Sequence, residues 1–245
     1  MTSTVTVFIP CLIDQLYPEM GVALVNILKH LGYEVRYADE AVCCGQPAFN
    51  AGHHKEALSV ASKFVSSLKN EETLVCPSGS CTAMVRRFYP ELFLGQCQET
   101  EARKLGTGLF EFSEFLAREG KLDKISGSAK GKVGFHNSCH ATRELKLRAQ
   151  PIDIMKRITG YELIEVEPVC CGFGGLFSIK FDEIAQGIAK TRLEMFTDKG
   201  AECIVSNDPG CIMHLKNEAK VLGNPLEILH LTEFVAKSMG LSTTL

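Results

Sequence analysis

The sequence contains the same unusual motif twice: two adjacent cysteines followed by glycine. The run from Cys170 to Gly175 is Cys-Cys-Gly-Phe-Gly-Gly, and the run from Cys43 to Pro47 is Cys-Cys-Gly-Gln-Pro. The second copy begins 127 residues after the first. Recurrence of a motif at a long interval indicates a duplicated structural unit. We therefore expect each half of the chain to place its own cysteine pair at an equivalent point in the fold.

Single cysteines accompany each pair at similar distances. In the first half, 31 residues separate Cys11 from the pair, and 36 residues separate the pair from Cys81. In the second half, 30 residues separate Cys139 from the pair, and 39 residues separate the pair from Cys211. Each half therefore supplies four cysteines in the same order.

The chain around the cysteines alternates between strand and helix patterns, and this alternation also repeats. Short β-branched runs predict strands, and apolar residues at helical spacing predict helices. The predicted strands cover residues 4–9, 33–37, 73–76, 132–136, 161–166 and 201–205. The predicted helices cover residues 17–31, 54–69, 81–89, 151–159 and 182–198, with a last helix from Cys211. The stretches 110–117 and 229–236 also match each other.

This alternation predicts an α/β fold, because strand–helix–strand units form right-handed crossovers around parallel sheets. We expect two pseudo-symmetric halves that arose by internal duplication, each a small parallel sheet flanked by helices. The first cysteine-rich repeat is expected at residues 1–120 and the second at residues 131–245. A Gly/Ser/Lys-rich linker is expected at residues 121–130.

The predicted topology brings the cysteines of each half together. In open parallel sheets, binding sites form at the carboxyl ends of the strands. Single cysteines lie just after four of the predicted strands, and these are Cys11, Cys81, Cys139 and Cys211. Each half can therefore gather its four cysteines at one edge of its sheet.

Four thiols are the ligand set of a [4Fe–4S] cluster, and thiolates are soft ligands that suit iron–sulfur groups. The glycine after each pair permits a positive φ and a close approach of the backbone to the sulfurs. We therefore expect one or two iron–sulfur clusters per chain. The expected ligands of one cluster are Cys11, Cys43, Cys44 and Cys81, and those of the other are Cys139, Cys170, Cys171 and Cys211.

Zinc binding and thiol redox chemistry are the alternatives, together with simple burial of the thiols. Structural zinc sites usually contain closely spaced cysteine pairs. The one close spacing of that kind is Cys76 with Cys81, and the repeat places Ser206 opposite Cys76, so Cys76 is expected not to be a ligand. Cys97 and Cys203 have no repeat partners and are expected to be free thiols.

Two histidines flank the first cysteine of the second half. His140 is a candidate for donating a hydrogen bond to a cluster or substrate, with a structural role as the alternative, and His136 or His140 is a candidate for assisting catalysis. His214 lies one helical turn after Cys211, but Met84 stands opposite it in the repeat. The repeat therefore does not support His214 as a ligand.

Charge, hydrophobicity and cysteine content indicate which classes of protein the sequence fits. The net charge of −3 gives no basic surface for nucleic acid, and no apolar stretch approaches the roughly 18 residues of a membrane span. The start of the sequence has no secretory signal pattern. Eleven cysteines without such a signal indicate metal binding or catalysis in a reducing compartment, so a cytoplasmic location is expected.

These motifs resemble a known family, the cysteine-rich CCG-domain proteins. That group includes the heterodisulfide reductase B subunit and the iron–sulfur subunits of glycolate and glycerol-3-phosphate oxidising complexes. The resemblance is closer to the lactate utilisation protein A family. It extends over nearly the whole chain and is carried by Pro10–Asp14, Cys43–Asn50, Pro77–Cys81, His136–His140, Cys170–Gly175 and Cys211–Met213.

The resemblance implies an iron–sulfur electron-transfer subunit, without flavin, of a complex that oxidises L-lactate to pyruvate. The implied partners are other subunits of that complex, including a ferredoxin-type iron–sulfur protein. One departure matters, because the last cysteine of the longer Cys-x-x-Cys motif is Met84 in one half and His214 in the other. This departure favours four-cysteine coordination and puts heterodisulfide reduction in doubt. A cluster-dependent catalytic subunit and a zinc-binding or thiol-redox interaction protein are the alternative functions.

Overall fold

The computed structural model describes residues 3–38, 43–224 and 226–244. The elements up to residue 118 are β1 (Thr4–Val7), α1 (Cys11–Leu16), α2 (Pro18–His30), β2 (Glu34–Tyr37), α3 (Gln46–Asn50), α4 (His54–Leu68), β3 (Leu74–Cys76), α5 (Gly79–Ala83), η1 (Met84–Phe88), α6 (Tyr89–Leu92), α7 (Glu99–Gly108), β4 (Leu109–Glu111) and α8 (Phe112–Arg118). The elements after it are η2 (Leu122–Lys124), β5 (Gly127–Ser128), β6 (Lys132–His136), η3 (His140–Glu144), α9 (Ala149–Arg157), β7 (Ile158–Thr159), β8 (Glu162–Ile164), α10 (Leu176–Lys180), α11 (Asp182–Thr197), β9 (Cys203–Ser206), α12 (Pro209–Val221), β10 (Glu227–His230) and α13 (Leu231–Ser238).

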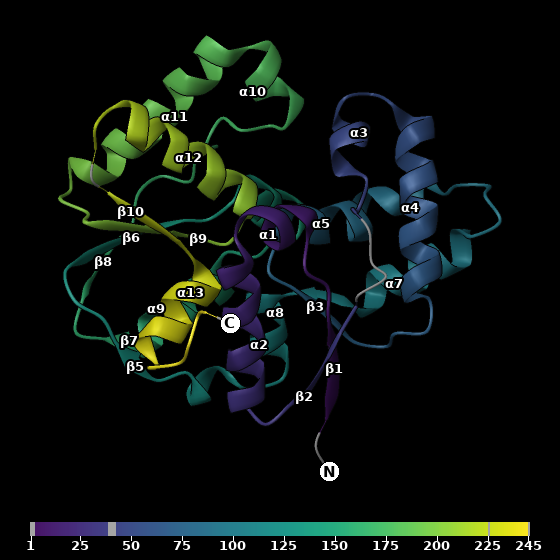
Figure 1. The fold of residues 1–245 in the computed structure, drawn as a ribbon, viewed down its shortest axis with the longest axis horizontal. Helices are drawn as coiled ribbons and strands as arrows, with labels where there is room; N and C mark the ends of the chain where they lie inside the picture. Colours follow the sequence, from purple (N-terminus) through teal and green to yellow (C-terminus); the bar gives the residue numbers. More distant parts are fainter. Residues whose placement is uncertain (1–2, 39–42, 225, 245) are drawn as a thin grey trace.

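Two four-stranded parallel sheets of the same topology form the frame of the molecule (Figure 1). The first sheet has the order β2-β1-β3-β4, and the second, taken from its matching edge, has the order β8-β6-β9-β10. The central strand of each sheet pairs with the third strand in the same way, Val7 opposite Val75 and Phe135 opposite Val205. The prediction of an α/β fold with two parallel-sheet halves is confirmed.

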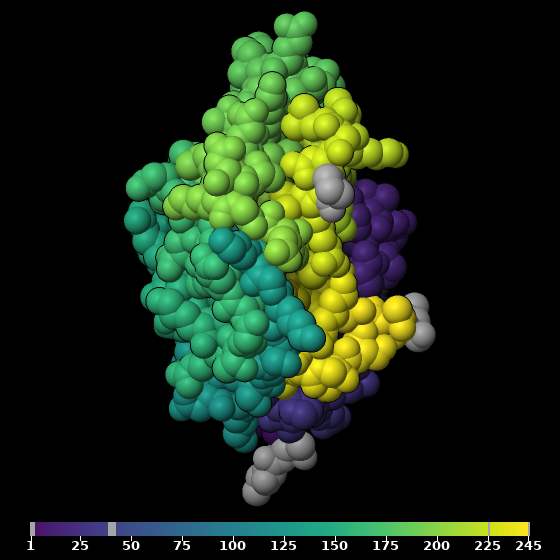
Figure 2. All heavy atoms as spheres, turned by 90° about the vertical axis from the view of Figure 1, so that its left-hand side faces the viewer, coloured from purple at the N-terminus to yellow at the C-terminus, as the bar shows by residue number. Residues whose placement is uncertain are grey.

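The two halves share one hydrophobic core. Helix α2 of the first half packs against α13 of the second, and α8 of the first half packs against α9 of the second. These helices lie between the two sheets, and the C-terminal segment runs beside the N-terminal helices on the face shown in Figure 2. Leu24, Phe115, Phe135 and Phe234, which come from both halves, belong to a single buried cluster.

The sequence of α2 shows why this central helix forms where it does. Pro18 occupies the start of the helix, where a missing N–H costs nothing, and Gly32 adopts a φ of +89° just after its end. Met20, Leu24 and Ile27 recur at helical spacing and are fully buried. The apolar stripe therefore directs the helix into the space between the sheets.

The segment at residues 121–130 contains short elements of its own. It holds the 3₁₀ turn η2 and the strand β5, which pairs in parallel with β7, and Ile125 within it is only 2% exposed. The division into repeats at residues 1–120 and 131–245 stays a prediction.

The helices that carry the last cysteine of each set begin earlier than predicted. Helix α5 begins at Gly79 and α12 begins at Pro209, so Cys81 and Cys211 are third in their helices rather than first. Ser78 and Asp208 cap these helices by accepting hydrogen bonds from backbone N–H groups. The predicted helix at 81–89 is in fact divided into α5, the π-helical turn η1 and α6.

Within the part of the chain that the structure describes, no helix is both long enough and apolar enough to cross a membrane.

Candidate metal centre

All eight cysteines of the two predicted sets line a single cavity of about 550 Å³. The cavity lies where the cysteine-bearing segments of the two halves meet. Its cysteine lining is Cys11, Cys43, Cys44, Cys81, Cys139, Cys170, Cys171 and Cys211. The structure therefore brings together every residue that the sequence predicted as a ligand, and it places both sets in one cavity, which the sequence did not predict.

The first set forms a chain of thiol contacts centred on Cys43. Cys11 and Cys44 donate hydrogen bonds to the sulfur of Cys43, and Cys44 also contacts Cys81. The hydrogen bond from Cys11, followed by that from Cys44, holds the pKa of Cys43 well below its usual range. The pKa values of Cys11 and Cys44 are raised, first by their hydrogen bonds to Cys43 and then by burial or further thiol contacts.

The second set repeats this arrangement. Cys139 and Cys171 donate to Cys170, whose pKa is lowered first by the bond from Cys139 and then by the bond from Cys171. The Sγ atoms of Cys171 and Cys211 lie 3.1 Å apart. In each half the first cysteine of the pair is therefore the thiol that ionises most readily, which favours metal binding as thiolate.

The glycine after each pair has the backbone shape that the motif requires. Gly45 has a φ of +83° and Gly172 a φ of +93°, in the left-handed region that side chains disfavour. The N–H of Gly45 donates to Cys43 Sγ over 3.4 Å, and the N–H of Gly172 donates to Cys170 Sγ over 3.4 Å. Both turns thus present a backbone donor to a sulfur.

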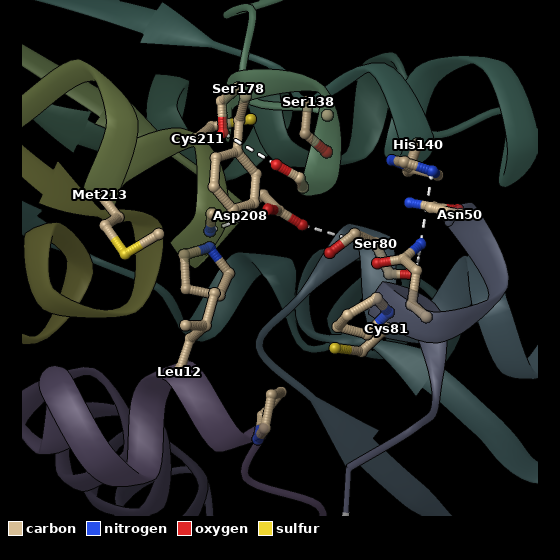
Figure 3. A pocket seen from close by; sticks show the side chains of 18 of the residues that line it. Leu12, Asn50, Ser80, Cys81, Ser138, His140, Ser178, Asp208, Cys211 and Met213 are labelled. Carbon is tan, nitrogen blue, oxygen red and sulfur yellow. Dashed lines mark hydrogen bonds between the residues drawn. The ribbon is translucent and has the colours of Figure 1, made fainter. Parts of the chain in front are cut away.

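The last cysteine of each set approaches the cavity from a helix, and the two helices are tied together. Asp208, which caps α12, accepts a hydrogen bond from the N–H of Ser80 on α5 over 2.8 Å. Figure 3 shows Cys81 and Cys211 on different sides of the pocket, with Ser80 and Asp208 between them. Sequence reasoning missed Asp208, although its place three residues before Cys211 marks it as a helix cap.

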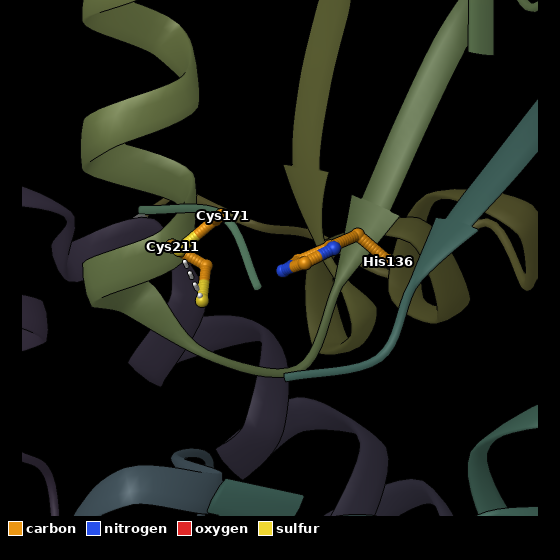
Figure 4. Close-up of side chains that lie close together, drawn as sticks. All are labelled: His136, Cys171 and Cys211. Atoms are coloured by element: carbon orange, nitrogen blue, oxygen red, sulfur yellow. Dashed lines mark hydrogen bonds between the residues drawn. The ribbon is translucent and has the colours of Figure 1, made fainter. Parts of the chain in front are cut away.

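The two histidine candidates have different surroundings. His140 lines the cavity, its Nδ1 lies 3.7 Å from Cys139 Sγ, and its Nε2 lies 3.4 Å from Gln46 Nε2. His136 is fully buried, and a ring nitrogen lies within 4.8 Å of the sulfurs of Cys171 and Cys211 (Figure 4). Burial, and then the charge of Arg192, lower the pKa of His136 to about 3.

Arg192 is a residue that sequence reasoning missed. It is 1% exposed and donates from Nε to His136 Nδ1 over 2.9 Å. Burial lowers the pKa of Arg192 to about 10, while the neighbouring thiols Cys171 and Cys211 oppose that shift. The signal that could have found it is a charged residue among the inward-facing positions of an otherwise amphipathic helix.

The remaining cysteines lie outside the lining of the cavity. Cys76 is buried beneath it, Cys203 is half-buried on strand β9, and Cys97 is exposed. The residues at the place of the missing fifth cysteine also stay apart from the cavity. Met84 packs in the core of the first half, and His214 Nε2 lies 3.1 Å from the carbonyl oxygen of Ala185.

The donor chemistry of the site fits an iron–sulfur group. Each set offers four thiols linked in a chain of contacts, one of them poised as thiolate, and a backbone N–H aimed at sulfur. Hydrogen bonds to sulfur are the usual means by which proteins adjust such clusters. Ligand sets made of soft sulfur atoms disfavour Mg²⁺ or Ca²⁺, which prefer oxygen ligands.

Comparison with known proteins agrees with this geometry. The family model described as a cysteine-rich domain, CCG, matches residues 5–86 and 133–216. Lactate utilization protein A of Geobacillus kaustophilus is 34% identical over 232 residues, which cover 94% of this chain and 97% of that protein. Lactate utilization protein A of Halalkalibacterium halodurans is 34% identical over 231 residues, covering 94% and 95%. Lactate utilization protein A 2 of Bacillus cereus is 30% identical over 239 residues, covering 96% and 99%.

Among solved structures, glutamate racemase RacE1 of Bacillus anthracis is similar with a TM-score of 0.42 and 13% identity, covering 97% of this chain and 80% of that one. A likeness of that degree defines neither a substrate nor a reaction. The family model and the relatives agree with each other along almost the whole chain. The chain therefore belongs to the lactate utilization protein A family of cysteine-rich CCG-domain proteins.

Proposed function

We propose that this protein is an iron–sulfur electron-transfer subunit of a complex that oxidises L-lactate to pyruvate. The observation that carries the proposal is the gathering of eight cysteines, as two equivalent sets of four, around one cavity. Cys11, Cys43, Cys44 and Cys81 would hold one cluster, and Cys139, Cys170, Cys171 and Cys211 would hold the other. Four thiols per set match the ligand count of a [4Fe–4S] cluster, which is the type that we propose.

The names of the relatives support the choice of lactate. Proteins called lactate utilization protein A match this chain over 94% of its length and are themselves almost fully covered. The match therefore spans nearly the full length of those relatives and is not confined to one shared module. It supports a place for this chain in lactate utilisation.

The chain's own residues have defined tasks in this proposal. The thiolates bind the metal, and the N–H groups of Gly45 and Gly172 donate to sulfur. Asp208 joins the two halves at the cavity by accepting from Ser80.

An iron–sulfur cluster supplies one-electron transfer, whereas lactate oxidation releases two electrons. The sequence contains no flavin or nicotinamide motif, so a partner subunit must remove the hydride. We expect these partners to include a ferredoxin-type iron–sulfur protein, and the complex to work in the cytoplasm.

Anaerobic purification with iron, sulfide and zinc analysis tests the proposal. Two clusters give about eight irons and as many sulfides per chain, and one cluster gives about four. Fewer than about three irons per chain contradicts even one intact cubane cluster. Zinc without sulfide identifies the protein as a zinc-binding one.

Reduction by lactate tests the role in a complex. The absorption of the clusters is expected to bleach with L-lactate only when the partner subunits are present. Bleaching of the isolated protein by lactate would mean that the substrate binds this chain, which is then the catalytic subunit. D-lactate serves as the matched control.

A further inference from the structure

The two cysteine sets are equivalent, but the side chains behind them are not. Phe8 follows the last residue of β1, three residues before Cys11, and His136 ends β6, three residues before Cys139. The equivalence of Phe8 and His136 follows directly from these positions.

The helices behind the sets give a second equivalent pair. The carbonyl oxygen of Ala57 on α4 lies against Gly45 in the same way that the carbonyl oxygen of Ala185 on α11 lies against Gly172. Seven residues after each alanine, two turns further along the helix, stand Phe64 and Arg192. Phe64 and Arg192 therefore occupy the same place in the two halves.

In the first half this place is apolar. The rings of Phe8 and Phe64 pack edge to face with centroids 4.8 Å apart, and neither is more than 1% exposed. In the second half the same place holds a cation and an imidazole joined by the 2.9 Å hydrogen bond from Arg192 Nε to His136 Nδ1. The duplicated sites thus differ by a buried positive charge and a polar ring.

The hydrogen bond fixes the tautomer of His136. A guanidinium has donors and no acceptor, so Nδ1 of His136 must be the acceptor and must carry no hydrogen. The neutral ring then carries its hydrogen on Nε2. Nε2 is fully buried and has no hydrogen-bond partner among the described residues. Figure 4 shows the far edge of the ring directed toward Cys171 and Cys211.

The charge of Arg192 is met by a carbonyl oxygen and an aromatic ring. Its NH1 group donates to the carbonyl oxygen of Glu167 over 2.6 Å, and its guanidinium lies 4.5 Å from the ring centre of Phe196. No carboxylate of the described chain forms an ion pair with it. The sulfurs of the second set are the groups near Arg192 that can carry negative charge, with Cys171 and Cys211 first among them.

We propose that Arg192 and His136 raise the reduction potential of the iron–sulfur group in the second site above that of the group in the first. Reduction adds negative charge, and a fixed cation together with an N–H aimed at sulfur stabilises the reduced form. Arg192 is a positioning residue, because it orients the Nε2–H of His136. The inference rests on the proposed function and adds to it a direction of electron flow, from the first site to the second.

The matched experiment exchanges the second pair for the first. The double variant His136→Phe/Arg192→Phe is expected to lower the potential of one of the two iron–sulfur signals in an anaerobic redox titration followed by EPR. The expected change is at least tenfold in the ratio of oxidised to reduced form, which is about 59 mV for one electron. The other signal is expected to stay unchanged. Phe64→Leu is the control in the first half, and it is expected to shift neither signal by a comparable amount.

Two single variants separate a specific effect from a packing effect. His136→Gln keeps an N–H donor near the ε position and is expected to keep most of the potential. Arg192→Gln keeps a donor for Nδ1 but removes the charge, and it is expected to lower the potential partway. These single variants also decide the matter if the double variant fails to fold or to bind iron.

The outcomes distinguish the two proposals. A wild-type protein without iron and sulfide overturns the proposed function, and this inference with it. If the wild-type protein contains iron but both potentials keep their wild-type values in the double variant, only this inference is overturned. The same holds if both potentials keep their wild-type values in the two single variants.

Discussion

The two halves of the molecule have the same sulfur geometry but a different lining behind it. In both halves a glycine in the left-handed region donates from its N–H to the first cysteine of the pair. Behind the sulfurs, Phe8 and Phe64 stand in one half where His136 and Arg192 stand in the other. The positions of the ligands are set by backbone shape, while the electric field on them is set by one layer of side chains. After a duplication, the positions of the ligands can therefore stay the same while the electric field on them changes.

The same contrast occurs at the far end of each sheet. Glu111 caps α8 and His230 caps α13, and each is the final residue of the last strand of its half. Burial raises the pKa of Glu111 to about 7 and lowers the pKa of His230 to about 3. An acid and a base thus fill one structural position, and burial favours the neutral form of each.

Removal of one thiol from each set is expected to have the largest effect on metal content. Cys43→Ala and Cys170→Ala each remove the thiol that two other cysteines of its set contact. Each variant is expected to lose about half of the iron and sulfide of the wild-type protein, because the other site keeps its four ligands. Iron and sulfide analysis after anaerobic purification measures this.

Cys97→Ala is the control, since Cys97 is exposed and lies outside the lining of the cavity. It is expected to retain all iron. If Cys43→Ala loses all iron while Cys170→Ala loses none, the chain holds a single cluster in the first site and the two halves are not functional equivalents.

Substitution of the two glycines is expected to destabilise the two halves by different amounts. A Cβ on Gly172 would lie 2.7 Å from the carbonyl oxygen of Ala185, whereas a Cβ on Gly45 would lie 3.1 Å from that of Ala57. Both substitutions impose left-handed strain of about 1–2 kcal/mol. Gly172→Ala adds a backbone clash, so its free energy of unfolding is expected to fall by about 3 kcal/mol, against about 1–2 kcal/mol for Gly45→Ala.

Anaerobic denaturant titration of both variants measures the difference. Gly187→Ala on α11 is the control, because a Cβ there meets no atom within 4 Å and alanine favours the helix. Equal losses for Gly45→Ala and Gly172→Ala would show that the second turn relaxes as easily as the first.

The buried cap Glu111 predicts a pH dependence of stability. Below the usual pKa of about 4.5 the carboxyl is protonated in both states, so burial carries no ionisation cost. Between about pH 4.5 and 7 the unfolded chain releases the proton while the folded chain retains it, so stability falls as the pH rises. Glu111→Gln cannot titrate and is expected to remove this part of the decline, at most about 3 kcal/mol.

Melting temperatures of wild type and variant across pH 5 to 8 measure this effect. The surface residue Glu56 provides the control Glu56→Gln, which is expected to leave the pH profile unchanged. A profile of Glu111→Gln parallel to that of the wild type would mean that the carboxyl of Glu111 is ionised in the folded protein throughout this range.

Much of the fold was predictable because the same sequence pattern occurs in both halves. The cysteine intervals and the strand–helix alternation predicted the α/β fold and two parallel sheets. The sequence did not predict that α2 would pack on α13 of the other half. An apolar stripe predicts that one face of a helix is buried, but it does not identify the helix that covers that face.

The ligand candidates were predictable from their spacing, but the shared cavity and the charge behind the second set were not. Arg192 stands where helical periodicity predicts an apolar residue, and its role depends on the hydrogen bond to His136, which is 56 residues away in sequence. The role of a polar side chain in the core depends on its hydrogen-bond partners, which come together only in the folded chain.

The smallest expected effect concerns a position at a strand end where one half has cysteine and the other has serine. Cys76 ends β3 and Ser206 ends β9, at equivalent places, and Cys76 donates from Sγ to the carbonyl oxygen of Ser78 over 3.8 Å. Cys76→Ser makes the first half match the second, and it is expected to retain all iron while losing about 1 kcal/mol of stability through burial of a hydroxyl. Iron analysis and denaturant titration of the one variant measure both quantities. Loss of about half of the iron would instead make Cys76 a ligand, and the two sets would then no longer be copies of one design.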